Sequence, residues 1–303
     1  MMRKMIRQTL VAALASLGAA SLVQAQTGLE MGQSPEQVQA RLETRCADLV
    51  RIDFEPTRHP SALSQETHLR CEGFDTGEGS RADQLLASFA DGRLFMLEAR
   101  GAMSGLEPET DPAGHLGGYA VYLPDLIITH AESGRWYQLA QMDQIPLAIG
   151  WDNPAWNGDQ PAAGSTGFAL PDWVRFGGPV DTLGSEAETA CPLQALRDIP
   201  EAWLDTQPQR QQQLDCYGIV VAGYPRKLEL VFGDGVLEQV WFMFGEADIP
   251  RARDWLIATY GPALHVDEQY EIFDDWRIAL RKDVPEIRAA SDRLAAIWAS
   301  EAE

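Results

Sequence analysis

The sequence predicts an α+β protein of two similar halves, each a short helix on an antiparallel β-meander with one disulfide. The main observation is a repeat. Leu69–Gly101 and Leu214–Gly245 both run Leu-x-Cys-x-Gly, a turn with Gly and Arg, an apolar strand, Phe-x-Asp-Gly-x-Leu and a second apolar strand ending at glycine. The chain is therefore interpreted as a signal peptide (1–25) followed by similar units at 26–165 and 166–303.

The first 25 residues have the pattern of a secretory signal peptide. Arg3, Lys4 and Arg7 precede an apolar run that closes on Val-Gln-Ala, so cleavage is expected before Gln26. The apolar run is too short for a membrane span, and no cysteine follows the cleavage site. We therefore expect a periplasmic or secreted protein without a membrane span or lipid anchor.

The chain is strongly acidic. The signal holds three of the 24 Lys and Arg residues and none of the 45 Asp and Glu residues, so the mature chain has a net charge of 21 − 45 = −24. Such a surface repels nucleic acid and anionic lipid headgroups, so neither is an expected partner. A solvated acidic shell explains the charge, and a cationic partner is the alternative.

In the first half, Ser34 is the expected N-cap of a helix over Pro35–Arg45, with Pro at the first position and Gln37 completing a capping box. A polar stretch then leads to a strand near Glu66–Phe74. Asp91-Gly92 between apolar runs predicts a hairpin. Later runs predict further strands: Tyr119–Tyr122, Leu126–Thr129, Gly134–Met142 and the apolar run Ile145–Trp151.

In the second half, a stretch about Glu186–Ile199 has an ambiguous helical pattern. Asp248–Tyr260 is a predicted helix ended by Gly-Pro, and the tail Ser291–Ala299 also looks helical. The remaining apolar runs predict strands: Leu214–Ala222, Lys227–Phe232, Val236–Phe244, Tyr270–Phe273 and Trp276–Leu280. Tyr-x-Val-Tyr at 119 recurs as Tyr-x-Ile-Phe at 270, which suggests that the duplication extends past the meander.

The four cysteines form two pairs of equal spacing, because 46 and 71 are 25 residues apart, as are 191 and 216. An even count in an exported protein indicates disulfides. Four cysteines allow three connectivities, and the duplication selects Cys46–Cys71 and Cys191–Cys216. A redox or metal site is the alternative, but the chain has no Cys-x-x-Cys and no histidine at ligand spacing.

Three of these features together resemble a known fold. They are the helix opened by Gly-x-Ser-Pro-Glu-Gln-Val at Gly32, the disulfide to a strand with Cys-x-Gly, and the Phe-x-Asp-Gly-x-Leu hairpin. They resemble the tandem-repeat units of β-lactamase inhibitory protein, and the same unit is similar to the SmpA/OmlA-type outer-membrane assembly lipoproteins. The cysteine spacing is not carried over from that inhibitor, and the lipid-bearing cysteine of the lipoproteins is missing. The resemblance implies binding through a sheet face, without catalysis.

No motif for catalysis, a metal or a cofactor stands out. The five histidines show no His-Glu-x-x-His, and the chain has no Gly-x-Ser-x-Gly, P-loop or dinucleotide fingerprint. Asp125, His130 and Ser133 are the nearest approach to a hydrolase set, and local crowding of common polar residues explains them. We therefore expect no cofactor and no metal, and name no catalytic residue.

The aromatic residues are the candidates for binding. They can serve as ordinary core residues, or as an exposed recognition surface, since aromatics dominate interface hot spots. In Val236–Phe244, alternation places Leu237, Gln239, Trp241 and Met243 on one face and Val236, Glu238, Val240, Phe242 and Phe244 on the other. The candidate binding residues are Trp136, Tyr137, Trp151, Trp156, Trp241 and Met243.

The sequence therefore predicts an exported, non-enzymatic binding protein that recognises a protein partner in the cell envelope, either as an inhibitor or as an assembly accessory. Two alternatives stay open. One is a periplasmic hydrolase whose active-site residues are dispersed in the sequence, and the other is an envelope structural protein. A pocket that brings His, Asp and Ser or Glu together would favour the enzyme.

Overall fold

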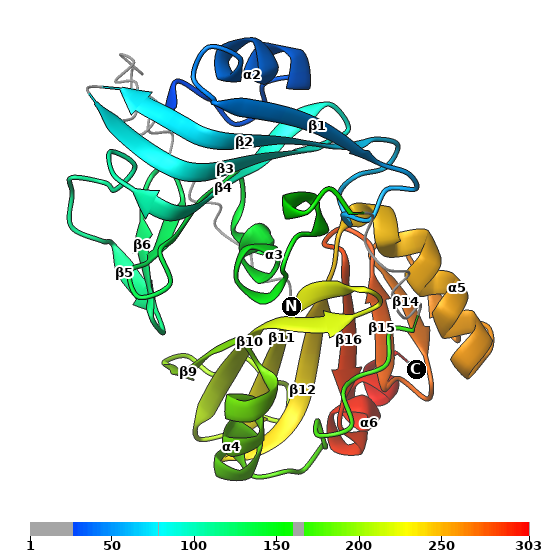
Figure 1. The fold of residues 1–303 in the computed structure, drawn as a ribbon. Coiled ribbons are helices and arrows are strands. Elements are labelled where there is room, and N and C mark those ends of the chain that lie inside the picture. The colour runs from blue at the N-terminus through cyan, green and yellow to red at the C-terminus, as the bar shows by residue number, and fades with distance from the viewer. Residues whose placement is uncertain (1–26, 78, 160–166, 303) are drawn as a thin grey trace, which may run out of the picture.

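The computed structural model describes residues 27–77, 79–159 and 167–302, and the predicted signal peptide lies outside them. The described chain forms two eight-stranded antiparallel sheets, one in each half (Figure 1). Sheet A contains β1 (Asp48–Phe54), β2 (Glu66–Gly77), β3 (Ser80–Ala90), β4 (Arg93–Met103), β5 (Gly114–Leu116), β6 (Tyr119–Tyr122), β7 (Ile127–His130) and β8 (Arg135–Leu139). Sheet B contains β9 (Leu193–Ile199), β10 (Gln211–Val221), β11 (Tyr224–Gly233), β12 (Val236–Met243), β13 (His265–Val266), β14 (Tyr270–Phe273), β15 (Ile278–Arg281) and β16 (Glu286–Ala290).

The two sheets have the same strand order. Sheet A runs β1-β2-β3-β4-β8-β7-β6-β5, and sheet B runs β13-β14-β15-β16-β12-β11-β10-β9, which is the same order read from the other edge. The recurring Tyr motifs form β6 and β14, which occupy the same place in their sheets. The fold is α+β with two similar units, and the similarity extends through all eight strands.

The repeated Phe-x-Asp-Gly-x-Leu segment forms the same hairpin in both halves. Asp91 and Gly92 have φ of 47° and 75°, and Asp234 and Gly235 have 47° and 82°, as a type I′ turn requires. The register shifts directly after each turn, between Ser88 and Phe89 in one sheet and between Val231 and Phe232 in the other. This bulge turns Leu237 into the same core as Val240 and Phe242, which corrects the simple alternation expected for β12.

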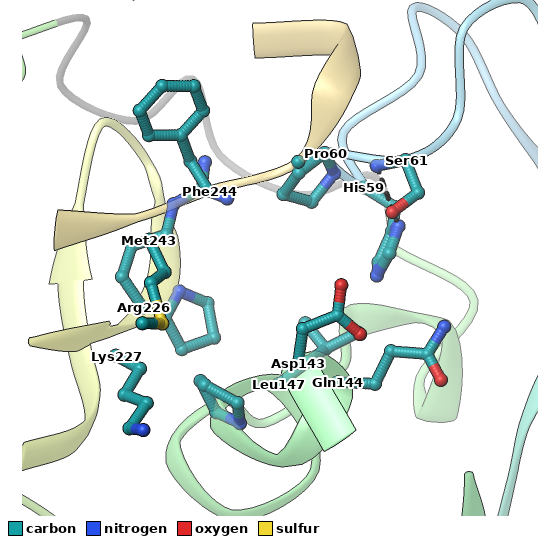
Figure 2. Close-up of a pocket in the computed structure, with 13 residues that line it drawn as sticks. His59, Pro60, Ser61, Asp143, Gln144, Leu147, Arg226, Lys227, Met243 and Phe244 are labelled. Atoms are coloured by element: carbon teal, nitrogen blue, oxygen red, sulfur yellow. Dashed lines mark hydrogen bonds between the residues drawn. The ribbon is translucent and has the colours of Figure 1, made fainter. Parts of the chain in front are cut away.

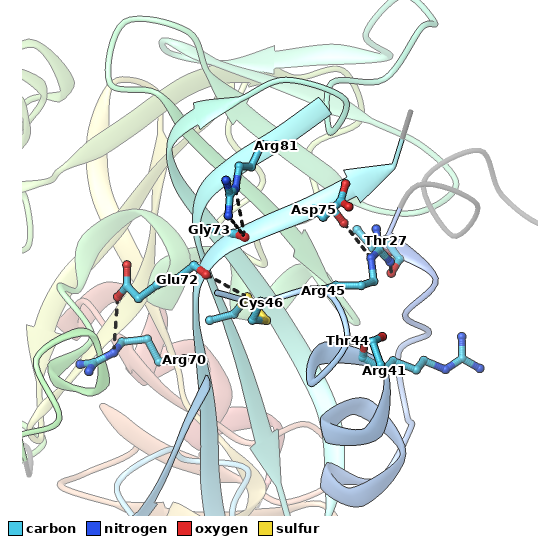
Figure 3. Close-up of a disulfide and its surroundings, with 11 residues drawn as sticks. Thr27, Arg41, Thr44, Arg45, Cys46, Arg70, Glu72, Gly73, Asp75 and Arg81 are labelled. Carbon is cyan, nitrogen blue, oxygen red and sulfur yellow. Dashed lines mark hydrogen bonds and ion pairs between the residues drawn. A yellow bond between two sulfur atoms is a disulfide. The ribbon is translucent and has the colours of Figure 1, made fainter. Parts of the chain in front are cut away.

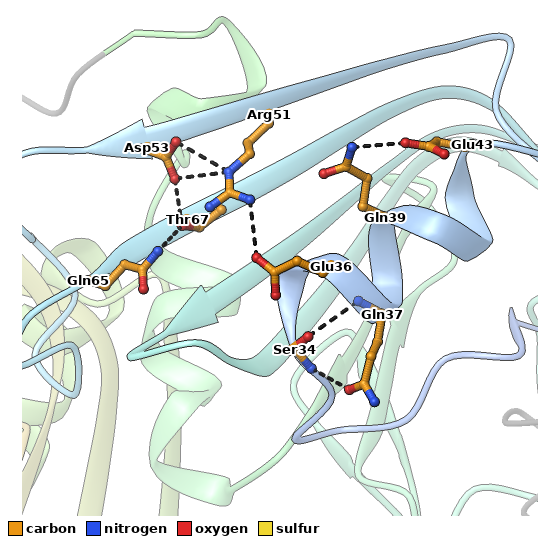
Figure 4. A network of polar contacts seen from close by, with 9 residues as sticks. All are labelled: Ser34, Glu36, Gln37, Gln39, Glu43, Arg51, Asp53, Gln65 and Thr67. Atoms are coloured by element: carbon orange, nitrogen blue, oxygen red, sulfur yellow. Dashed lines mark hydrogen bonds and ion pairs between the residues drawn. The ribbon is translucent and has the colours of Figure 1, made fainter.

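Helices α4 (Val180–Ala190) and α5 (Ile249–Tyr260) pack on one face of sheet B and α6 (Asp292–Glu301) packs on the other, whereas α2 (Pro35–Leu42) packs against the core of sheet A. Helix α2 has the expected capping box between Ser34 and Gln37, shown in Figure 4. Helix α4 occupies the same position before β9. The other helix and the 3-10 turns are η1 (Met142–Gln144), α3 (Ile145–Gly150), η2 (Pro154–Trp156) and η3 (Glu246–Asp248).

Both predicted disulfides are present. Cys46 bonds Cys71 and Cys191 bonds Cys216, with Cα–Cα distances of 5.4 and 5.5 Å. Each joins the end of a helix to the second strand of its sheet. Around Cys46 the backbone is also paired, because the N–H of Ala47 donates to the Glu72 carbonyl and Arg45 Nε donates to the Asp75 carbonyl (Figure 3). Disulfides of this kind indicate an extracellular or otherwise oxidising compartment.

Three element predictions were wrong. Asp48–Phe54 is the edge strand β1, where no strand was predicted. The ambiguous helix about Glu186–Ile199 ends at Ala190, and Leu193–Ile199 is the strand β9. The apolar run Ile145–Trp151, predicted as a strand, is instead the short helix α3. No helix among the described residues is long and apolar enough to cross a membrane.

The halves meet around α3, which lies between the two sheets in Figure 1. Its apolar side chains join a buried cluster that contains residues from both halves, among them Met96, Tyr137, Ile149, Leu193 and Tyr217. The backbones touch where α3 ends, because a Cβ added to Gly150 would lie 2.1 Å from the Gly218 Cα atom. Gly218, in the repeated Cys-x-Gly, has a φ of 81° that favours glycine.

We expect Gly150→Val to lower the free energy of unfolding by about 2 kcal/mol, because the added side chain would force α3 away from β10. Thermal and urea unfolding of the variant measure the effect. Gly184→Val is the matched control, since a Cβ at Gly184 in α4 meets nothing within 4 Å. Equal stability of the two variants would contradict the close contact between the halves.

Candidate functional site

A small cavity lies between the two halves. Three segments far apart in sequence line it: the β1–β2 loop, the η1–α3 region, and the neighbouring ends of β11 and β12 (Figure 2). The lining residues are His59, Pro60, Ser61, Asp143, Gln144, Pro146, Leu147, Pro225, Arg226, Lys227, Met243, Phe244 and Gly245. Its volume of about 50 Å³ suits a few water molecules, whereas small-molecule sites measure about 300–1,000 Å³.

A buried ion pair forms the second-half wall of this cavity. Arg226 donates to Asp248 Oδ2 at 2.6 Å, and the two side chains are 3% and 10% exposed. Arg251 also lies 2.8 Å from Asp248 and is 42% exposed. Burial lowers the pKa of Arg226 to about 10, so the guanidinium stays charged at neutral pH and needs the Asp248 carboxylate.

His59 forms the opposite wall and is buried as a neutral ring. The ring packs 4.2 Å from Phe95, and its Nδ1 accepts a hydrogen bond from the Ser61 backbone N–H at 3.1 Å. Burial lowers its pKa to about 4, and Arg226 and His68 act in the same direction against Glu66. At neutral pH the ring therefore carries no charge.

Stability should fall in acid because of His59. Its folded pKa of about 4 lies below the unfolded value of 6.5, so the unfolded chain binds more protons between these two values. The free energy of unfolding should then drop by about 2–3 kcal/mol as the pH falls from 7 to 4. The measurement is urea unfolding across this range for the wild type and His59→Asn, whose difference isolates the histidine.

The exposed histidine His265 supplies the control for this prediction. His265→Asn should change the pH dependence of stability far less, because His265 and its partner Asp267 are both about half exposed and such pairs contribute little. A pH dependence of His59→Asn that matches the wild type would contradict the buried neutral ring.

A chain of Ser, His and Glu lies next to this region, on the inner face of sheet A. His68 Nδ1 lies 2.9 Å from Ser88 Oγ, and His68 Nε2 lies 3.1 Å from Glu66 Oε1. Such a set has the residue types of a hydrolase. The three residues are 1%, 0% and 1% exposed, however, so Ser88 cannot reach a substrate in this conformation. Mutual satisfaction of buried polar groups explains the arrangement.

The sequence contains a signal for this Ser–His–Glu set. Glu66 and His68 are two residues apart in a strand and so share one face, and the β2–β3 register places Ser88 opposite His68. His130 and Ser133, which the sequence analysis considered with Asp125, do not form a hydroxyl-to-ring contact like that of Ser88 and His68. The Ser133 hydroxyl donates to the His130 carbonyl rather than to its ring, and its backbone N–H donates to His130 Nδ1.

Three of the six predicted binding residues are buried. Trp136 and Tyr137 are 0% exposed, and Trp156 is 8% exposed. Trp156 Nε1 donates to Glu98 Oε2 at 3.0 Å, and Arg100 lies both over the Trp156 ring and 2.8 Å from Glu98. Burial raises the pKa of the Glu98 carboxyl, and Arg100 opposes this shift. In this conformation Trp136 belongs to the main core of the first half, and Tyr137 and Trp156 are buried on the other face of sheet A.

The other three predicted residues are half-buried. Trp151 packs 5.1 Å from Tyr224 at the junction of the halves. Trp241 and Met243 lie on the face of sheet B that is opposite to its main core. We define the central patch as these two residues with their strand neighbours on that face: Lys227, Glu229, Trp241, Met243, Glu286 and Arg288.

Arg288 has an unusual environment within the central patch. Its guanidinium lies 3.7 Å from the Trp298 ring centre, 5.3 Å from Tyr270 and 5.8 Å from Trp241. Its Nε is buried without a hydrogen-bond partner, and no carboxylate lies within 4.0 Å among the described residues. Burial lowers its pKa. The neighbouring cations are paired, since Lys227 lies 2.5 Å from Glu229 and Arg281 lies 2.8 Å from Glu286.

No cluster of three or more potential metal ligands occurs in the described parts of the chain. Comparison of the sequence with protein-family profiles, with curated proteins and with solved structures finds no match.

Proposed function

We propose that this is an exported, non-enzymatic binding protein that recognises a protein partner through the central patch of sheet B. Arg288 is the observation that carries the proposal. It is an arginine held against aromatic rings without a carboxylate of its own. Arginine and tryptophan are the side chains that most often dominate protein interfaces.

The environment of Arg288 indicates what the partner contributes. A stacked guanidinium keeps its N–H groups in a fixed fork that suits a carboxylate. The proposed partner therefore places an acidic side chain at Arg288 and apolar contacts at Trp241 and Met243. The paired charges around them hold the patch in one arrangement before binding, which reduces the entropy lost on association.

Two further observations support binding over catalysis. His59, Ser61 and Asp143 line the cavity between the halves, but the cavity is too small for an organic substrate, and the His59 ring accepts from the Ser61 backbone N–H rather than from its hydroxyl. The Ser88 hydroxyl is buried. Ser88 does not belong to the central patch, and the cavity lies between the halves.

Photo-crosslinking in the producing cells tests the proposal. A benzophenone side chain at Met243 should give one adduct of discrete mass, and the same group at Ala40, which is exposed on α2, should not. Arg288→Ala should reduce the adduct about tenfold or more, because truncating one partner of a buried charge pair costs about 2 kcal/mol or more. Arg210→Ala is the matched control, since Arg210 is a 64% exposed arginine of the same half.

The thermal midpoint of each variant shows whether it is folded. Adducts of equal yield from positions 243 and 40 would contradict the proposal. So would an adduct at position 243 that survives Arg288→Ala unchanged in a folded protein.

A further inference from the structure

A second, larger cavity lies in the second half, away from the central patch. Its volume is about 480 Å³, within the usual range for small-molecule sites. It opens between α5, the segment at 168–176, and the strands β15 and β16. Most of its wall is apolar, and the apolar and aromatic side chains that line it include Phe168, Leu170, Phe176, Trp255, Tyr260 and Ile278.

One wall of this cavity, helix α5, is an addition to the repeated unit. Helix α5 lies in the connection between β12 and β13, beside β14 and β15 in Figure 1. The equivalent connection in the first half, residues 104–113, contains no helix. The shared eight-stranded fold thus forms without α5.

Aromatic rings fix the inner wall. The Phe168 ring packs 6.0 Å from Phe242, 5.7 Å from Phe244 and 6.3 Å from Trp255, and Trp255 lies 6.1 Å from Tyr260. These contacts hold the rings in place before any ligand enters. Aromatic faces also attract positively charged groups.

The mouth of the cavity carries more negative than positive charge. Arg277 lies 2.8 Å from Asp274 and 3.5 Å from Asp292, so one guanidinium faces two carboxylates. Asp274, Asp275 and Trp276 have φ of 50°, 49° and 71°, a left-handed conformation that aspartate tolerates and tryptophan rarely adopts. Strain of this kind is concentrated at functional sites.

We propose that this cavity binds a cationic amphiphile. The apolar chain or ring occupies the space lined by Phe168, Trp255 and Ile278, and the positive end lies at the mouth near Asp292. The acidic chain as a whole favours this charge over an anionic molecule of the same length.

Calorimetric titration with dodecyltrimethylammonium below its micelle concentration tests the proposal, with laurate and dodecanol as the anionic and neutral probes. We expect one tight site for the cation and weaker binding of the other two probes. Ile278→Trp fills the cavity and should weaken binding of the cation about tenfold or more. Ile257→Trp adds the same ring to α5 at a 44% exposed position and should bind as the wild type does.

The Asp292→Asn variant tests the contribution of charge to binding separately from the contribution of cavity shape. The Asp292 side chain is 90% exposed, so the change removes the surplus negative charge with little effect on folding. The preference for the cation over dodecanol should fall severalfold. If a folded Ile278→Trp variant binds the cationic probe as tightly as the wild type does, the probe adsorbs to the surface and the proposal is overturned. Tighter binding of laurate than of the cation would overturn the assigned charge.

Discussion

Replacing Asp248 by alanine should lower the free energy of unfolding by about 3–5 kcal/mol. The change leaves Arg226, 3% exposed, without a carboxylate in a region from which water is largely excluded. Arg251 loses the same partner but is partly solvated, so it contributes little. Urea unfolding gives the value, and Asp254→Ala, at an exposed aspartate on helix α5, which begins directly after Asp248, is the control.

A second variant distinguishes the ion pair from the helix end that Asp248 occupies. In Asp248→Ala with Arg226→Met both charges are gone, and replacing a buried pair by apolar side chains is often nearly neutral. The double variant should therefore regain most of the stability lost in the single variant. If Asp248→Ala is as stable as Asp254→Ala, the pair does not hold this part of the interface between the halves.

Removing either disulfide should cost about 3–4 kcal/mol, because each closes a loop of 25 residues in the unfolded chain. The variants are Cys46→Ser with Cys71→Ser, and Cys191→Ser with Cys216→Ser, which leave no odd thiol. The two halves have separate main cores, one containing Leu69 and Phe89 and the other Leu214 and Phe232. Each loss should therefore fall mainly on its own half.

Hydrogen exchange with mass spectrometry measures where protection is lost. We expect faster exchange in β1–β4 for the first pair and in β9–β12 for the second. The wild type with its disulfides intact is the reference, and Ser34→Ala, which removes only a helix cap, is a mild control at about 1 kcal/mol. Uniform loss of protection across both halves would show a single cooperative unit and contradict this expectation.

The elements that could be predicted from the sequence are those with a strong local signal. The hairpins at Asp91 and Asp234 and the capping box at Ser34 depend on neighbouring residues, and the disulfide pairing follows from the equal cysteine spacing in the two halves. β9 was not predictable in this way, because Leu193–Ile199 contains good helix formers and becomes a strand only by pairing with β10. Tertiary contacts decide such segments.

The candidate sites were harder to predict, for a related reason. The cavity between the halves combines residues near 59, 143 and 226, and sequence patterns do not show such contacts. Trp241 and Met243 could be placed on a sheet face, but Arg288 joins them only through the pairing of β12 with β16. The bulge at Glu238 also had to be known before the side chains on each face could be assigned.

The shared strand order has a consequence for how the protein tolerates high concentration. It places β1 and β5 at the edges of sheet A, and β9 and β13 at the edges of sheet B. β5 and β13 have only three and two residues, whereas β1 and β9 carry exposed charges such as Arg51 and Asp198. Very short strands and charged side chains at an edge prevent another chain from adding a strand. The duplicated order therefore limits aggregation and domain swapping through all four sheet edges.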